Sequence, residues 1–141
     1  MQKEELAVYI NQFCLHVYEF ERALAKQFQT EHSLVYDSWS KHIPRMGTID
    51  INGQIWDYRF HGAGCALTFG KTQVDYDYAP MDTNTIKISE FYLEQFIHSV
   101  QPEQELKKEI TEVLLYDLVK EGLLQKREWG DFEFDRKNLR F

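Results

Sequence analysis

The sequence predicts an α+β protein with a long N-terminal helix, a four-stranded antiparallel β-meander, two further helices and a C-terminal edge strand or hairpin, in two-layer packing. Apolar residues recur every three or four positions before residue 28, alternate with polar residues between 48 and 78, and return to helical spacing after 89. Each pattern leaves one apolar side on its element, and these sides are buried by packing against one another. The length of 141 residues suits a single domain, 1–141.

The first helix is predicted from Leu6 onward, because its apolar residues fall on one face and charged residues occupy the other. No period continues from Glu31 to Gly47, so this stretch is predicted to be a loop that Trp39 attaches to the core. The apolar stripe of the helix comprises Leu6, Ile10, Phe13, Val17, Phe20, Leu24 and Phe28.

The meander is predicted from strict alternation that is divided by turn residues at 52–53, 62–64 and 70–71. One face of the resulting sheet should be aromatic and the other charged, because successive side chains of a strand point to opposite faces. The aromatic face would hold Trp56, Tyr58, Phe60, Val74, Tyr76 and Tyr78, and the charged face Asp57, Arg59, His61, Asp75 and Asp77.

Two shorter helices and a final extended run are predicted after the meander. Ser89 suits the N-cap of the first, Pro102 suits the first position of the second, and Gly122 suits the position just after its end. The stripe of the second helix is predicted to be Leu106, Ile110, Val113, Leu114 and Leu118. From 124 to 134 alternation returns, as expected of an edge strand or hairpin.

Charge and composition narrow the functional classes. The chain has 16 basic and 23 acidic residues and a net charge of -7, which argues against nucleic acid or an anionic membrane as the main partner. The N-terminus is acidic and no apolar run is long enough to span a bilayer, so a cytoplasmic location is expected. Cys14 and Cys65 lack metal-site spacing, and we expect no cofactor and no metal.

The most distinctive segment is Phe60-His61-Gly62-Ala63-Gly64-Cys65, followed ten residues later by Asp75-Tyr76-Asp77-Tyr78. It resembles a group of uncharacterised bacterial domains with a His-Gly-x-Gly-Cys turn and an Asp-x-Asp strand, which are similar to the immunity proteins of polymorphic toxin systems. The resemblance implies a small cytoplasmic protein that neutralises a toxin by binding it. It carries over no catalytic residues.

The residues themselves leave three functions open. Gly62 and Gly64 are explained by a tight connection between strands, whereas His61 with Asp75 or Asp77 could serve a small hydrolase or nuclease-like enzyme. Residues 112–135 faintly resemble the recognition helix and wing of a winged helix-turn-helix regulator, although the acidic residues there would repel phosphates.

The sequence therefore favours a non-enzymatic protein-binding module, most concretely an immunity-type inhibitor whose acidic surface docks on a basic toxin domain. The charged face of the meander is the predicted docking surface, with exposed aromatic residues as anchors. The predicted partner-binding residues are Asp57, Arg59, His61, Asp75, Asp77, Tyr78 and Trp129.

Overall fold

The structure is a computed structural model that describes residues 1–29, 43–61, 66–75, 85–126 and 132–141. These residues form two compact units, one built from 1–15 and 84–141 and the other from 16–83. The first helix, α1 (Lys3–Gln27), gives its first half to one unit and its second half to the other. In the described part of the chain, no helix is both long and apolar enough to cross a membrane.

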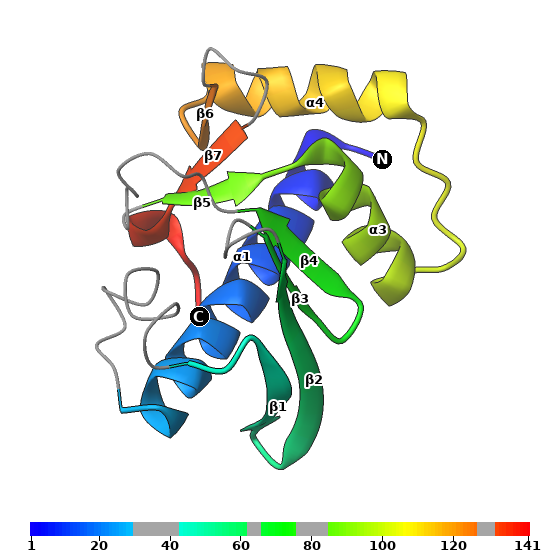
Figure 1. Ribbon diagram of the computed structural model, residues 1–141. Helices are drawn as coiled ribbons and strands as arrows, with labels where there is room; N and C mark the ends of the chain where they lie inside the picture. Colours follow the sequence, from blue (N-terminus) through cyan, green and yellow to red (C-terminus); the bar gives the residue numbers. More distant parts are fainter. Residues whose placement is uncertain (30–42, 62–65, 76–84, 127–131) are drawn as a thin grey trace. The chain divides into compact units, whose positions relative to one another are not determined.

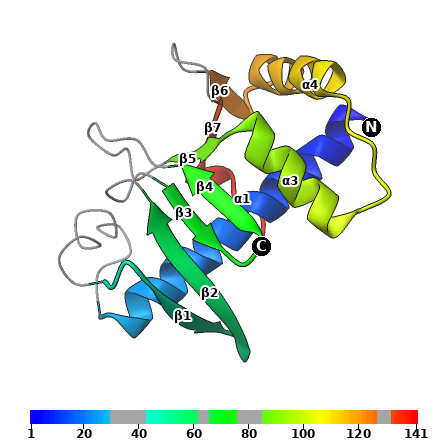
Figure 2. The ribbon, with the colours of Figure 1, turned by 45° about the vertical axis from the view of Figure 1, so that its right-hand side comes forward.

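The predicted meander is confirmed in the unit of residues 16–83. Its strands are β1 (Met46–Ile51), β2 (Gln54–His61), β3 (Ala66–Phe69) and β4 (Thr72–Asp75), paired antiparallel in the order β1-β2-β3-β4 (Figure 2). Asn52 and Gly53 both have positive φ, 52° and 86°, which is the backbone that a two-residue hairpin turn requires. The Asp50 carboxylate accepts a hydrogen bond from the Gly53 N–H at 2.8 Å.

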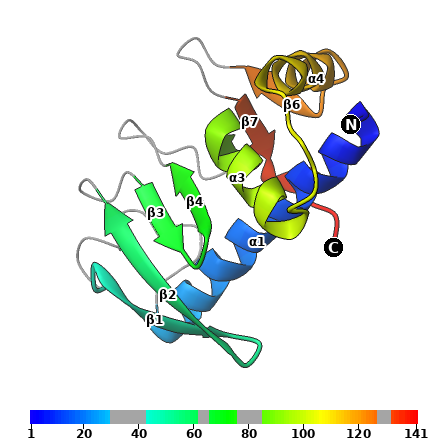
Figure 3. The same ribbon diagram turned by 90° about the vertical axis from the view of Figure 1, so that its right-hand side faces the viewer.

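The second half of α1 covers the aromatic face of this sheet (Figure 3). Phe20 stacks on Phe69 with ring centroids 4.2 Å apart, and the Phe20 and Tyr58 rings meet edge to face with centroids 5.9 Å apart. Tyr58, Phe60 and Val74 are buried as the alternation predicts, and Trp56 is half-buried. Tyr76 and the loop residue Trp39 lie outside the described residues.

The other unit has its own three-stranded antiparallel sheet (Figure 1). After β5 (Thr85–Ile88) come α3 (Glu90–Val100), α4 (Lys108–Lys120), β6 (Leu124–Lys126) and β7 (Phe132–Asp135), with a 3-10 turn at Arg136–Asn138. The sheet order is β5-β7-β6, so the predicted C-terminal hairpin is present and β7 is its central strand.

This unit has the connectivity of a winged helix. Its elements follow one another as helix, strand, helix, helix, strand, strand, and its last strand lies between the other two. In the sequence, the four-stranded meander is inserted after the first helix.

The core of the unit of residues 1–15 and 84–141 includes Phe13 and Phe96, whose rings meet edge to face with centroids 5.4 Å apart. It also buries Leu6, Ile10, Ile86, Ile88, Leu93, Ile97, Leu115, Leu118, Leu124, Phe132 and Phe134.

The predicted start of the helix after residue 100 is wrong. Pro102 does not open it: residues 101–104 form a turn, with the Gln104 N–H bonded to the Gln101 carbonyl at 3.0 Å. The helix α4 begins at Lys108, after the N-cap residue Lys107. The hydroxyl of Thr111 donates to the Lys107 carbonyl at 3.1 Å, which gives this carbonyl a side-chain partner within the first turn.

The predicted stripe of α4 is also wrong in part. Ile110 and Val113 are 49% and 60% exposed, whereas Thr111, Leu115 and Leu118 are buried. The end of the helix is as predicted. Gly122 has a φ of +84°, its N–H bonds to the Val119 carbonyl, and the next N–H, of Leu123, bonds to the Leu118 carbonyl, which is the Schellman arrangement.

Candidate functional site

One face of the four-stranded sheet is not covered by the helix, and we call it the open face. The register places Met46 opposite Arg59, Thr48 opposite Asp57 and Asp50 opposite Ile55, and directly paired residues point to the same side. The face contains only exposed or half-buried side chains. These are Met46, Thr48, Asp50, Ile55, Asp57, Arg59, His61, Ala66, Thr68, Gln73 and Asp75.

Four of the predicted site residues lie on the open face. Asp57, Arg59 and His61 alternate along β2, and Asp75 lies on β4. Asp57 and Arg59 are exposed, and His61 and Asp75 are half-buried. The other predicted residues, Asp77, Tyr78 and Trp129, lie outside the described residues, as does the glycine turn at 62–65.

His61 has a partner on the neighbouring strand. Its Nε2 lies 2.9 Å from the hydroxyl oxygen of Thr68 on β3, a hydrogen bond within the open face. In the register, Ala66 pairs with His61 on one side and Asp75 on the other. The backbones of His61 and Asp75 are therefore two strand spacings apart, roughly 10 Å. At this spacing, the backbone does not by itself place the His61 and Asp75 side chains close enough to exchange a proton.

The charges of the open face do not assemble a metal site among the described residues. No group of three or more His, Cys, Asp or Glu side chains in this part of the chain could hold a metal ion. Asp57 and Arg59 lie two residues apart on the same strand, so the one carboxylate of β2 has a cation as its neighbour on the same side. The arrangement suits the recognition of a charged surface.

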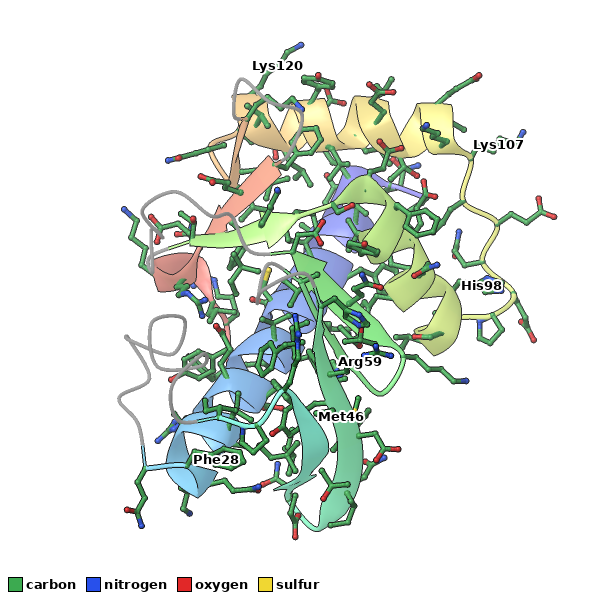
Figure 4. All side chains as sticks on the ribbon, in the orientation of Figure 1. Phe28, Met46, Arg59, His98, Lys107 and Lys120 are labelled. Carbon is green, nitrogen blue, oxygen red and sulfur yellow. The ribbon has the colours of Figure 1, made fainter. Side chains whose placement is uncertain are left out.

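Two apolar residues of the open face were not among the predicted site residues. Met46 and Ile55 are 58% and 64% exposed, in the same rows as Arg59 and Asp50. Figure 4 labels Met46 and Arg59 on their neighbouring strands. The alternation of β2 contained the signal for Ile55: its neighbour Trp56 belongs to the aromatic face, so Ile55 must point to the charged one. Large apolar side chains on an exposed polar face are a common feature of binding surfaces.

The unit of residues 1–15 and 84–141 contains a separate groove of about 650 Å³. An ion pair between Lys3 and Glu121 bridges part of it. The Asn11 side chain donates to the Arg140 carbonyl at 2.9 Å and accepts from the Arg140 N–H at 2.8 Å, so one carboxamide holds the C-terminal backbone. The apolar residues of the groove are Ala7, Val8, Leu118, Leu123 and Phe134.

Comparison with known proteins identifies a family without a described function. Residues 6–138 match the family model described as a domain of unknown function, DUF6896, and because this match covers almost the whole chain, the chain belongs to that family. No curated protein and no solved structure matches the chain.

Proposed function

We propose that this member of the DUF6896 family is a non-enzymatic protein-binding module, an immunity-type inhibitor that neutralises a bacterial toxin domain in the cytoplasm by direct binding. The observation that carries the proposal is the open face, where exposed apolar side chains stand among acidic ones. A protein interface typically combines a few large anchors with a polar surround. Met46 and Ile55 are the anchors in this proposal.

The charge of the open face favours a basic partner. Its described residues include Asp50, Asp57 and Asp75 against the single cation Arg59. A toxin domain that acts on nucleic acid needs a basic surface to hold phosphate, and acidic side chains can pair with the same cations. Docking of this kind would block the entry of the toxin's substrate.

A small hydrolase that uses His61 with Asp75 or Asp77 is a weaker alternative. The His61 ring is bonded to Thr68, and the Ala66 position separates its strand from that of Asp75. The geometry of the described residues therefore favours a hydrogen-bonded sheet face over a reacting pair of His61 and an aspartate.

A winged-helix regulator is the second alternative, and one specific observation favours it. The order of helices and strands in residues 1–15 and 84–141 is that of a winged helix. Against it, these segments carry 14 acidic and ten basic side chains. A duplex would meet a surface with too few cations to neutralise its phosphates.

The test uses the toxin domain that the proposal expects to be encoded beside the gene. Co-expression should restore growth of cells that produce this toxin domain, and the two purified proteins should bind in biolayer interferometry. Replacing both anchors, Met46→Ala and Ile55→Ala, should weaken binding by about tenfold or more. The matched control is Val8→Ala, which removes an exposed apolar side chain (56%) from α1 and should change the Kd by less than about twofold.

Two results would contradict the proposal. One is a toxin domain that is neither bound nor neutralised. The other is binding that the two open-face substitutions leave unchanged, because the inhibitor would then use another surface.

A further inference from the structure

The turn between β1 and β2 contains an asparagine followed directly by a glycine, Asn52-Gly53. Both residues are exposed, and they join the two strands at the lower end of the sheet (Figure 2). A Cβ added to Gly53 would meet no atom of the described residues within 4 Å, so nothing there crowds the backbone at this position.

This pair of residues has a chemical reaction of its own. The backbone nitrogen of the glycine, once it has lost its proton to hydroxide, can attack the Cγ atom of the asparagine side chain. The bond from Cγ to the carboxamide nitrogen then breaks, and ammonia leaves with a proton taken from water, which closes a five-membered succinimide ring. Water opens the ring at either carbonyl to give aspartate, or isoaspartate, whose backbone runs through the side chain. Glycine permits the attack because it has no Cβ to obstruct it.

The closed turn holds the reacting atoms apart. The φ of Asn52 is 52°, in the left-handed region, where ψ is about +30 to +60°. At such a ψ the Asn52 Cβ and the Gly53 nitrogen lie on opposite sides of the Cα–C bond, whereas the ring needs them on the same side. The ring can therefore form only after a rotation about this bond, which opens the two-residue turn.

Asp50 restrains the nitrogen that would attack. Its carboxylate accepts a hydrogen bond from the Gly53 N–H at 2.8 Å, and a charged acceptor makes this bond stronger than one between neutral groups. The N–H must leave this acceptor before it can lose its proton to hydroxide. The negative charge of the carboxylate also opposes the formation of an anion on the nearby nitrogen.

We propose that Asn52 is a site of spontaneous deamidation, that opening of the β1–β2 hairpin controls its rate, and that Asp50 keeps the hairpin closed. Isoaspartate adds a backbone carbon to a turn whose length fixes the register, so the converted hairpin no longer supports the pairing of Asp50 with Ile55. The conversion thus alters the open face in one direction only. It needs no partner, so the inference is independent of the inhibitor proposal.

Peptide mapping of the full chain by mass spectrometry at mildly alkaline pH, with fragmentation that distinguishes isoaspartate from aspartate, measures the conversion. Heavy-oxygen water labels each ring that has been hydrolysed. Conversion at Asn52 should be at least about tenfold slower in native buffer than in urea. This slowing should agree within about threefold with the protection of the Gly53 N–H from hydrogen exchange, because the same opening exposes both. In urea, Asn11 and Asn138 should convert more slowly than Asn52, because bulkier residues follow them.

Variants of Asp50 separate the protection by the turn from the chemistry of the pair itself. Asp50→Ala should accelerate conversion of the folded protein by about fivefold or more, and leave the rate in urea within about twofold. Asp50→Asn keeps an oxygen acceptor without the charge and should give a smaller acceleration. The matched control is Glu19→Ala, which removes an exposed acid of α1 from the same unit and should change neither rate.

Three results would overturn the inference. One is conversion at the same rate in native buffer and in urea, because the turn would then give no protection. Another is an equal rate for Asp50→Ala and the wild-type protein under native conditions, because the carboxylate would then not hold the turn. The third is an Asn52 that stays intact in urea, because the pair would then be unreactive.

Discussion

The ring of Trp56 lies directly over Gly70. A Cβ built on this glycine would be 2.4 Å from both Cε3 and Cζ3 of the indole, and Gly70 has a φ of +55°. The Gly70 N–H also bonds to the Asp57 carbonyl at 3.1 Å, which fixes the β3–β4 turn against β2. His16 of α1 meets the other rings of this cluster, with centroids 5.2 Å from Trp56 and 4.9 Å from Phe69. The turn and β2 thus meet at Gly70, and the helix joins them through the Trp56 and Phe69 rings.

We predict that Gly70→Ala destabilises the protein through both the backbone and the contact with Trp56. The left-handed backbone costs an alanine about 1 to 2 kcal/mol, and displacing the indole adds about 1 to 3 kcal/mol. Urea unfolding measures the sum. Gly53→Ala is the matched control, because Gly53 has a φ of +86° and no atom within 4 Å of the added Cβ, so only the backbone cost applies.

Equal losses in the two variants would mean that the Trp56 contact relaxes without cost. A double-mutant cycle with Trp56→Leu sharpens the comparison, because a smaller side chain leaves room for the Cβ. In that background, Gly70→Ala should cost no more than Gly53→Ala.

The second prediction concerns the aromatic core of the sheet. Phe60 is 4% exposed and its ring centroid lies 5.7 Å from that of Tyr58, so truncation leaves a cavity. Phe60→Ala should lower the free energy of unfolding by about 3 to 5 kcal/mol. Ile55→Ala on the open face should change it by less than about 1 kcal/mol, because Ile55 is 64% exposed. Similar losses at both positions would contradict the assignment of the two faces.

The sheet could be predicted from the sequence because two local signals agree there. Alternation assigns Tyr58 and Phe60 to one face and Asp57 and Arg59 to the other, and the Asn52-Gly53 turn fixes the register of the first hairpin. The open face follows from the same alternation. Its apolar members could have been found in the same way, since Met46 and Ile55 are in phase with the charged residues.

The exposed side of α4 could not be predicted in this way. Apolar residues occur around most of this helix, so a stripe through Ile110 and Val113 and a stripe through Leu115 and Leu118 both have helical spacing. Only packing against the rest of the unit selects between the two stripes. Thr111 can be buried there because its hydroxyl bonds to the Lys107 carbonyl. Contacts between distant segments, such as Asn11 with the backbone of Arg140, leave no periodic signal either.

The third prediction is a loss of stability in mild acid that depends on His16. Burial lowers the pKa of this histidine in the folded protein below the ordinary value of 6.5. The unfolded chain therefore binds more protons at this position between the two pKa values. The free energy of unfolding is therefore highest above pH 6.5, and it decreases as the pH falls through 6.5 towards the pKa of the folded protein.

Urea unfolding at pH values between 7.5 and 5 measures this effect. The variant His16→Gln has no charge to gain, so its stability should fall less than that of the wild-type protein over the same range. Parallel curves for the two proteins would show that another group causes the acid sensitivity.

The last prediction concerns the charge of the open face in partner binding. Complementary charge acts mainly on the association rate and is screened by salt. Replacing Asp57 and Asp75 by Asn should therefore slow association with the toxin domain severalfold at low salt, as is typical of charges at the rim of an interface. The same change should flatten the salt dependence of the association rate. The thermal midpoint should change little, because neither side chain is buried.

Glu103→Gln with Glu105→Gln removes two exposed acids of the other unit, and should leave the rate and its salt slope unchanged if docking uses the open face alone. A common slope for all three proteins in stopped-flow measurements would place the docking surface outside the open face.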